Sequence, residues 1–319
     1  SLSSGGINIQ EPKGTVSIKD TTIEKCEATG TYSAGGGIHL YKGTCTLEKV
    51  TIQECKAPKG GGIFVSENAE CILKQDVTIF KNEATGTNSN GGGIFVSKNA
   101  DSTQFGTLTI KGTSDNPVTI SENKAEYGGG LYNFGTVTIK NAKIEKNEVP
   151  HHGGGMVNAE TCTMDSVKLE NNKAGSEGGG IYSSKVLTLK DTTVTGNEAT
   201  MSGGAIQIAT ADSVFNMSGS TVITAEPSGG PGKPSKNDIY LTNTAFITLT
   251  GELTATGKIA RITLNSSGGY QNNREIVKGD SDFTIPSGYD TKFEITDKIG
   301  NPQHWKLIYQ SKALKLKQN

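Results

Sequence analysis

A short glycine-rich signature returns along most of this 319-residue sequence. Three glycines followed by an apolar residue, or the variant GGAI, start mostly 25 residues apart, with two longer intervals of 31 and 37 residues. The longer intervals exceed 25 by 6 and 12 residues, which indicates loops inserted into a fixed unit. A fixed period of this length predicts a solenoid, in which each repeat buries its apolar side chains only against its neighbours. The signatures start at Gly35, Gly60, Gly91, Gly128, Gly153, Gly178 and Gly203.

A second signature follows about 20 residues into each unit. An aliphatic residue stands three positions before an Asn or Cys, and an Ala stands two positions after it in all but one copy. An amide repeated at one position of a solenoid can donate to and accept from its neighbour in the next coil, which avoids burying an unpaired polar group. We therefore predict an internal asparagine ladder at a corner, ended by two small cysteines. The column holds Cys26, Cys55, Asn82, Asn123, Asn147, Asn172 and Asn197.

The segments between these signatures have the pattern of short strands. They alternate apolar and polar residues and are rich in Thr, Val and Ile, and no helical periodicity is present. Stacking equivalent strands in parallel buries the apolar set of every repeat. The sequence therefore predicts an all-β, right-handed parallel β-helix of about 25 residues per coil, with coils about 4.8 Å apart. A propeller is disfavoured because its blades need about 40–50 residues each.

The pattern loosens from Ser218 onward. A turn-rich stretch from Pro227 predicts a loop, and Asn237 then returns to the asparagine column without a glycine triplet. We predict a β-helix repeat domain over residues 1–264 and an irregular C-terminal β cap over 265–319, with a small separate β-domain as the alternative. Terminal repeats of a solenoid must cover an open core, and the single Trp305 is expected to do so.

Composition excludes several classes of protein. Lys and Arg total 31 against 32 Asp and Glu, so the net charge of -1 excludes a basic nucleic-acid footprint. No run approaches the roughly 18 apolar residues of a membrane helix, so no transmembrane span is expected. The five cysteines are too few for a disulfide scaffold. Cys45, Cys71 and Cys162 share one column, where parallel Cβ vectors favour buried free thiols over disulfides.

Charged residues alternate in sign on both sides of the asparagine column. In one copy Lys81 precedes Asn82 and Glu83 follows it, and the signs exchange in the next copy. Stacked coils would then place opposite charges above and below each other, and each exposed pair contributes only about 0–1 kcal/mol. We interpret the pattern as specifying register and solubility; the alternative is a charged binding face.

One outward column is rich in aromatic residues. In the strand after each glycine triplet the first residue should point inward and the next outward, and the outward residue is aromatic in four of seven copies. Such a row can stack on sugar rings or anchor a partner protein. The alternatives are a stabilising ring stack or a row covered by the inserted loops. His39 occupies the same column and is expected at the surface. The predicted binding residues are Phe64, Phe95, Tyr132 and Tyr182.

The sequence offers no recognisable catalytic constellation. Acid–base chemistry needs carboxylates that converge in a cleft, but the Asp residues are scattered and the only arginines, Arg261 and Arg274, lie outside the regular coils. His151 and His152 precede a glycine triplet without flanking residues at metal-ligand spacing, which favours an exposed turn over a metal site. We therefore expect no catalytic residue, no metal and no cofactor.

The paired signatures, GGG[ILM] or GGAI and aliphatic-x-x-Asn, resemble the GGA[ILV] and FxxN repeats of the chlamydial-type polymorphic outer-membrane protein family. The resemblance covers roughly residues 5–241; most copies here have GGG for GGA and an aliphatic residue for Phe. It implies a pectin-lyase-like β-helix of a bacterial surface protein, placed at the cell surface, in the outer membrane or secreted.

The functional expectation is a monomeric, non-catalytic adhesin that binds a host protein or glycan through a surface face. A polysaccharide lyase or glycoside hydrolase on the same fold is the first alternative. A structural spacer within a larger surface protein is the second. A convergent carboxylate cluster on one coil face would favour the enzyme, and an evenly charged polar surface would favour the spacer.

Overall fold

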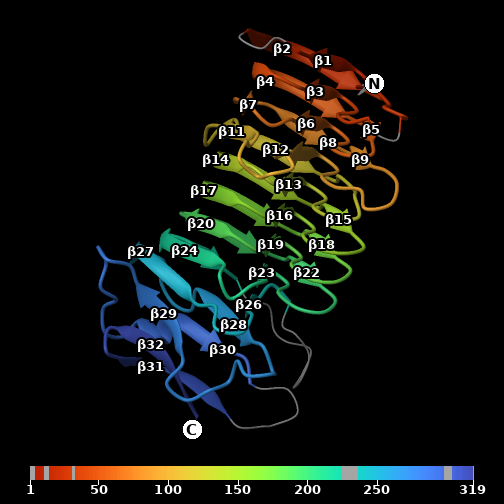
Figure 1. Ribbon diagram of the computed structural model, residues 1–319. Coiled ribbons are helices and arrows are strands. Elements are labelled where there is room, and N and C mark those ends of the chain that lie inside the picture. Colours follow the sequence, from red (N-terminus) through yellow and green to blue (C-terminus); the bar gives the residue numbers. More distant parts are fainter. Residues whose placement is uncertain (1–3, 11–13, 31–32, 225–235, 298–303, 319) are drawn as a thin grey trace.

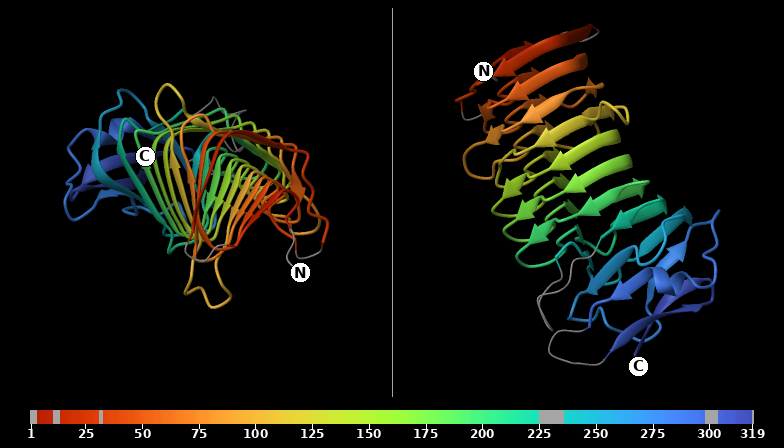
Figure 2. Two further views of the ribbon diagram at one scale, coloured as in Figure 1. Left: turned by 90° about the horizontal axis from the view of Figure 1, so that it is seen from above. Right: turned by 180° about the vertical axis from the view of Figure 1, so that it is seen from behind.

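The computed structural model describes residues 4–10, 14–30, 33–224, 236–297 and 304–318 (Figure 1). Successive coils stack into one elongated parallel β-helix, and β-strands make up nearly all its regular structure (Figure 2). A coil without insertions spans 25 residues, as the pairing of Ile181 with Ile206 shows, and the average is about 28 residues per turn. The predicted all-β parallel β-helix is confirmed.

The first sheet follows the glycine triplets. Most of its strands contain three residues and pair in parallel, and their middle residue is half-buried in some coils and buried in others. In stacking order they are β1 (Ile7–Ile9), β3 (Ile38–Leu40), β6 (Ile63–Val65), β10 (Ile94–Val96), β13 (Leu131–Asn133), β16 (Met156–Asn158), β19 (Ile181–Ser183), β23 (Ile206–Ile208), β26 (Ile239–Leu241), β28 (Ala260–Leu264) and β30 (Phe293–Ile295).

The second sheet contains the long strands of each coil. Most of its ladders are parallel and keep their register from coil to coil. Its strands are β2 (Thr15–Glu24), β4 (Gly43–Gln53), β7 (Ala69–Leu73), β8 (Thr78–Phe80), β11 (Thr107–Lys111), β12 (Val118–Ser121), β14 (Thr136–Glu145), β17 (Thr161–Glu170), β20 (Val186–Lys190), β21 (Thr193–Thr195), β24 (Val214–Gly219), β25 (Val222–Ile223), β27 (Ile247–Leu253), β29 (Glu275–Gly279), β31 (Trp305–Gln310) and β32 (Ala313–Gln318).

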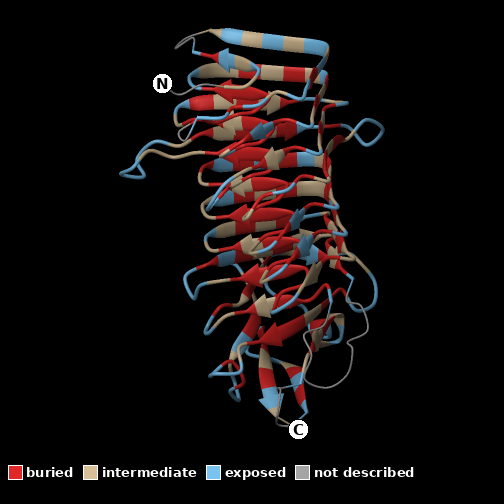
Figure 3. Ribbon diagram, turned by 90° about the vertical axis from the view of Figure 1, so that its right-hand side faces the viewer, coloured by how far each residue is buried: buried red, intermediate tan, exposed pale blue. Residues whose placement is uncertain are grey.

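Two small sheets complete the coils just after the asparagine column. One pairs β5 (Lys56–Ala57) with β9 (Glu83–Ala84), and the other stacks β15 (Glu148–Val149), β18 (Lys173–Ala174) and β22 (Glu198–Ala199). Buried aliphatic side chains fill the interior of the coils, while exposed residues gather on loops and outer rows (Figure 3). Each coil therefore contributes one layer to a continuous core.

The glycine triplet serves two geometric purposes. Its first residue has a positive φ in every copy, for example 71° at Gly153, which residues with a Cβ rarely adopt. Its second residue needs space instead, because a Cβ at Gly154 would clash with the carbonyl oxygens of Gly179 and Lys173 in the next coil. The triplet thus combines a sharp turn with close backbone stacking.

The predicted asparagine ladder is confirmed. Asn147 Nδ2 donates to Asn172 Oδ1 at 2.9 Å and to the Ile120 carbonyl at 3.0 Å, and its Oδ1 accepts from the backbone and side chain of Asn123. The ladder runs from Asn82 to Asn237, and each amide also donates to the carbonyl of an aliphatic-x-x-Asn residue in the preceding coil. At the other end the Cys55 N–H donates to Asn82 Oδ1. The aliphatic-x-x-Asn signature therefore supplies both the amide and its acceptor.

The coil stack closes at its C-terminal end with an antiparallel hairpin. Parallel pairing continues past Leu264 into β29 and β30, and β32 then pairs antiparallel with β29 and with β31. Trp305 is buried on β31 beside Tyr270, with ring centroids 5.7 Å apart. The division at residues 264 and 265 stays a prediction, and the parallel ladders cross it. Most of the loop predicted from Pro227 lies outside the described residues.

Candidate functional site

The aromatic column forms a continuous ring stack over three coils. Phe64 on β6 lies over Phe95 on β10, with centroids 5.0 Å apart and planes 9° apart, and Phe95 lies over Tyr132 on β13 at 5.5 Å and 22°. In-register pairing of the three strands places these residues opposite one another. Both faces of the Phe95 ring are therefore covered by neighbouring rings.

Lysine side chains cover part of this stack. Phe95 is only 3% exposed, whereas Phe64 and Tyr132 are half-buried. Lys59 Nζ lies 5.6 Å from the Phe95 ring centroid. Lys98 lies over the Phe134 ring and forms a 3.1 Å ion pair with Glu160. The stack thus presents Phe64 and Tyr132 to solvent more than Phe95.

Tyr182 belongs to a second aromatic group on the same face. Val157 separates it from Tyr132 in the column. Its ring stacks on His152 at 4.8 Å, and Tyr127 stacks on His151 at 4.9 Å. This group is half-buried and includes a carboxylate, because His152 Nδ1 lies 3.7 Å from Glu177 Oε2.

Burial shifts the pKa values of titratable groups in both parts of the aromatic column. Burial, opposed by the Glu177 carboxylate, lowers the pKa of His152. Burial and Glu177 raise the pKa of Tyr182, and burial raises that of Tyr132 to about 12. Near neutral pH the face therefore presents neutral tyrosines and an imidazole held toward its neutral form. The assignment of Phe64, Phe95, Tyr132 and Tyr182 to a binding face stays a prediction.

The expectation that His39 lies at the surface is wrong. His39 is 1% exposed, since its ring packs edge-on against Phe64 and Tyr41 and its Nε2 lies 3.2 Å from Ser66 Oγ. Burial lowers the pKa of His39. At the His39 end, the outward column is therefore covered by neighbouring side chains and not open to solvent.

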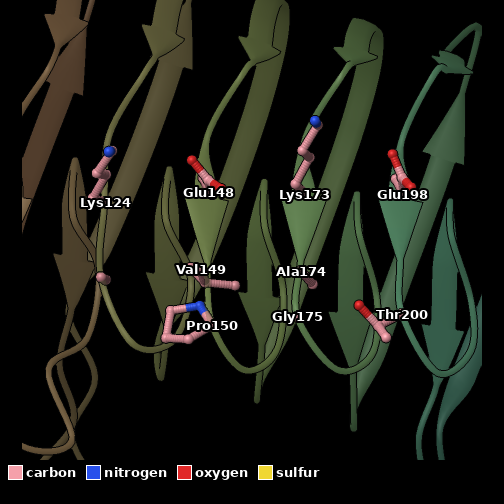
Figure 4. A pocket seen from close by; sticks show the side chains of 10 residues that line it. Lys124, Glu148, Val149, Pro150, Lys173, Ala174, Gly175, Glu198 and Thr200 are labelled. Carbon is pink, nitrogen blue, oxygen red and sulfur yellow. The ribbon is translucent and has the colours of Figure 1, made fainter.

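A shallow groove of about 520 Å³ lies on another face, along the small sheet β15–β18–β22 (Figure 4). Its floor consists of small side chains, including Ala125, Val149 and Ala174, which pack as a separate apolar cluster. Beside the floor run residues of alternating charge, which we call the charged row: Lys124, Glu148, Lys173 and Glu198. Further along the stack the pattern continues in a 2.9 Å ion pair between Lys56 and Glu83. The prediction that stacked coils place opposite charges next to each other is confirmed in this row, and its interpretation as specifying register stays a prediction.

Buried titratable groups lie elsewhere in the stack. All five cysteines are free thiols, and burial raises the pKa of Cys45 to about 11. Asp238 is fully buried, where it accepts hydrogen bonds from the Gly204 N–H and the Thr263 hydroxyl. Burial raises its pKa to about 6. Among the described residues, no group of three or more His, Cys, Asp or Glu could hold a metal ion.

Three features of the structure have no clear signal in the sequence. Asn133, Asn158 and Ser183 form a second buried ladder, but two Asn copies are too few to stand out as a column. Tyr127 and Glu177 directly precede glycine triplets. Equivalent positions carry different residue types, so only the fold shows that they lie beside the aromatic column. Asp238 has no counterpart in other coils.

Comparison with known proteins identifies one repeat. Residues 166–184 match the family model of the Chlamydia polymorphic membrane protein (Chlamydia_PMP) repeat. This stretch contains both signatures, from Leu169 and Asn172 to the triplet at Gly178. None of the curated proteins and none of the solved structures matches the chain.

The matched repeat and the parallel β-helix together fit a surface β-helix protein, and the repeat family implies an outer-membrane or surface location. Across the described ranges, no helix is both long and apolar enough to pass through a membrane.

Proposed function

We propose that this chain is a non-catalytic β-helix protein of a bacterial surface that adheres to a host protein through its aromatic column and the group around Tyr182. One observation carries the proposal: aromatic rings gather on one outward column, from Phe64 to Tyr182. Tyrosines and histidines at the edge of such a patch suit a protein interface, because each offers an apolar body and a polar tip.

The ring geometry favours a protein partner over a glycan. A sugar stacks on a free ring face, but both faces of Phe95 and one face of Tyr182 are covered by neighbouring rings. A protein side chain can instead contact ring edges and accept hydrogen bonds from the tyrosine hydroxyls.

Retention of the labelled chain on cultured epithelial cells tests this proposal. We expect retention to fall for Tyr182→Ala and to persist for Tyr309→Ala, an exposed tyrosine on β31 outside the column. Trypsin treatment of the cells should abolish retention, and enzymatic removal of glycans should leave it intact. Loss only after glycan removal would identify a glycan ligand, and equal retention of both variants would refute the assigned face.

The non-catalytic part of the proposal has a separate test. The purified chain is incubated with acidic and neutral polysaccharides and Ca²⁺, and new chain ends are measured against a heat-treated sample. We expect no release above that control. Release would replace the adhesin with a lyase or hydrolase.

A further inference from the structure

The charged row beside the groove has a regular axial pattern. Lys124, Glu148, Lys173 and Glu198 occupy successive coils through in-register parallel pairing. Neighbouring residues are therefore about one strand spacing apart, roughly 4.8 Å. The three residues Lys124, Glu148 and Lys173 are exposed, and Glu198 is half-buried with Lys236 at 3.4 Å. Figure 4 shows the four side chains one after another along the groove.

We propose that this groove is an interface with a second copy of the same chain. Two copies would lie antiparallel, related by a two-fold axis that passes between the coils of Glu148 and Lys173. This axis places Glu148 opposite Lys173 of the second copy, and Lys124 opposite Glu198. All four ion pairs of the symmetric contact then join opposite charges.

Charge complementarity favours a second copy of the chain as the partner, and it fixes how the coils of the two copies align. A two-fold axis through the Glu148 coil itself would place Glu148 against Glu148 and Lys124 against Lys173, so that every contact would be repulsive. A partner must also repeat at the coil spacing to meet each charge in turn. A second copy has that spacing and the alternation, and a two-fold contact is closed and self-limiting.

The groove floor permits close approach. Ala125, Val149 and Ala174 are 7%, 3% and 5% exposed and carry short side chains. Pro150, Gly175 and Thr200 continue the surface beside them without long side chains. The long Lys and Glu side chains of one copy can therefore reach those of the other across a low surface.

The association should be weak and sensitive to salt. Exposed ion pairs contribute little individually, and salt screens them. We expect reversible dimers whose dissociation constant rises about tenfold or more between about 50 mM and about 500 mM sodium chloride. Sedimentation equilibrium of the wild-type chain over a range of concentrations measures this shift.

Charge reversal provides the specific test. Glu148→Lys/Glu198→Lys gives a row of four lysines, and Lys124→Glu/Lys173→Glu gives a row of four glutamates. We expect each variant alone to be monomeric and an equimolar mixture to recover the dimer. Glu145→Lys/Glu170→Lys is the matched control, because these residues lie on β14 and β17 of the same two central coils, outside the groove.

Two results would overturn the proposal. One is a wild-type chain that stays monomeric at about 1 mM in low salt, where even an association of about 4 kcal/mol would be visible. The other is a mixture of reversed variants that stays monomeric although both keep the wild-type circular dichroism spectrum. If a reversed variant fails to fold, Glu148→Gln/Glu198→Gln replaces it, and the dimer should then weaken and lose most of its salt dependence.

Discussion

The asparagine column and the aromatic column run along the same coils, one inside and one outside. Inside, Asn82 to Asn237 repeat the same hydrogen bonds without a break. Outside, the ring stack stops at Val157, restarts at Tyr182 and is partly covered by lysines from loops. A side chain at an inward position must pack against or hydrogen-bond to the equivalent residue of the next coil. An outward side chain has no such requirement, so its residue type can vary from coil to coil. The difference assigns the first column to folding, and recognition by the second column stays a proposal.

The largest effect is expected where the inner column is broken. Asn147→Ala leaves the buried Asn123 N–H and the Ile120 carbonyl without their side-chain partner. Each orphaned group costs about 1–3 kcal/mol, so we expect a loss of about 4 kcal/mol in the free energy of unfolding. Urea denaturation measures it, with exposed Lys168→Ala expected within about 0.5 kcal/mol of wild type. If Asn147→Ala lost no more unfolding free energy than the control, the ladder would not stabilise the stacking of the coils.

Crowding of the glycine corner should have the next largest effect. Gly154→Ala places a methyl group against the carbonyl oxygens of Gly179 and Lys173, and we expect a loss of about 3 kcal/mol. Gly257→Ala is the control. An alanine there is strained by the positive φ of 71°, but no atom lies within 4 Å of the added Cβ, so the substitution causes no crowding. Its cost should be about 1 kcal/mol. Equal losses in thermal denaturation would contradict the close-stacking role of the second glycine.

Asp238 directly follows Asn237, the last amide of the inner column, and it should make the stability of the fold depend on pH. The raised pKa of Asp238, about 6, means that the folded state favours the protonated carboxyl. Its stabilising contribution is complete below the ordinary pKa of an aspartate, about 4, and is lost as pH rises through about 6. In Asp238→Asn the amide oxygen can still accept from the Gly204 N–H. The amide Nδ2 can donate to the Thr263 hydroxyl oxygen, whose own proton is free to go to Thr296, so both contacts persist without a titrating charge.

We therefore expect wild type to lose about 2–3 kcal/mol relative to Asp238→Asn between pH 4 and pH 8, measured by urea denaturation at each pH. The comparison between variants cancels the opposite effect of buried His39, whose lowered pKa destabilises the fold in acid. Parallel pH profiles of the two chains would show that Asp238 does not titrate between the two pH values.

The inward features were predictable because they repeat. Seven copies of one column revealed the ladder, the cysteines that end it and the spacing of the coils. The outer surface was less predictable, since its contacts depend on side chains that differ from coil to coil. The sequence showed that Phe95 points outward, but the cover from Lys59 requires the path of the neighbouring coil. His39 was misplaced for the same reason, because its burial depends on Tyr41 and Ser66.

Substitutions in the aromatic column should have the smallest effect on the free energy of unfolding and the largest effect on binding to cells. Tyr132 and Tyr182 are half-buried at its exposed end, and their loss should cost less than breaking the ladder. The central measurement is the apparent dissociation constant of Tyr132→Ala/Tyr182→Ala on epithelial cells, with its thermal midpoint measured on the same sample. We expect a folded chain whose affinity falls by about tenfold or more. A folded double variant that binds as tightly as wild type would contradict it.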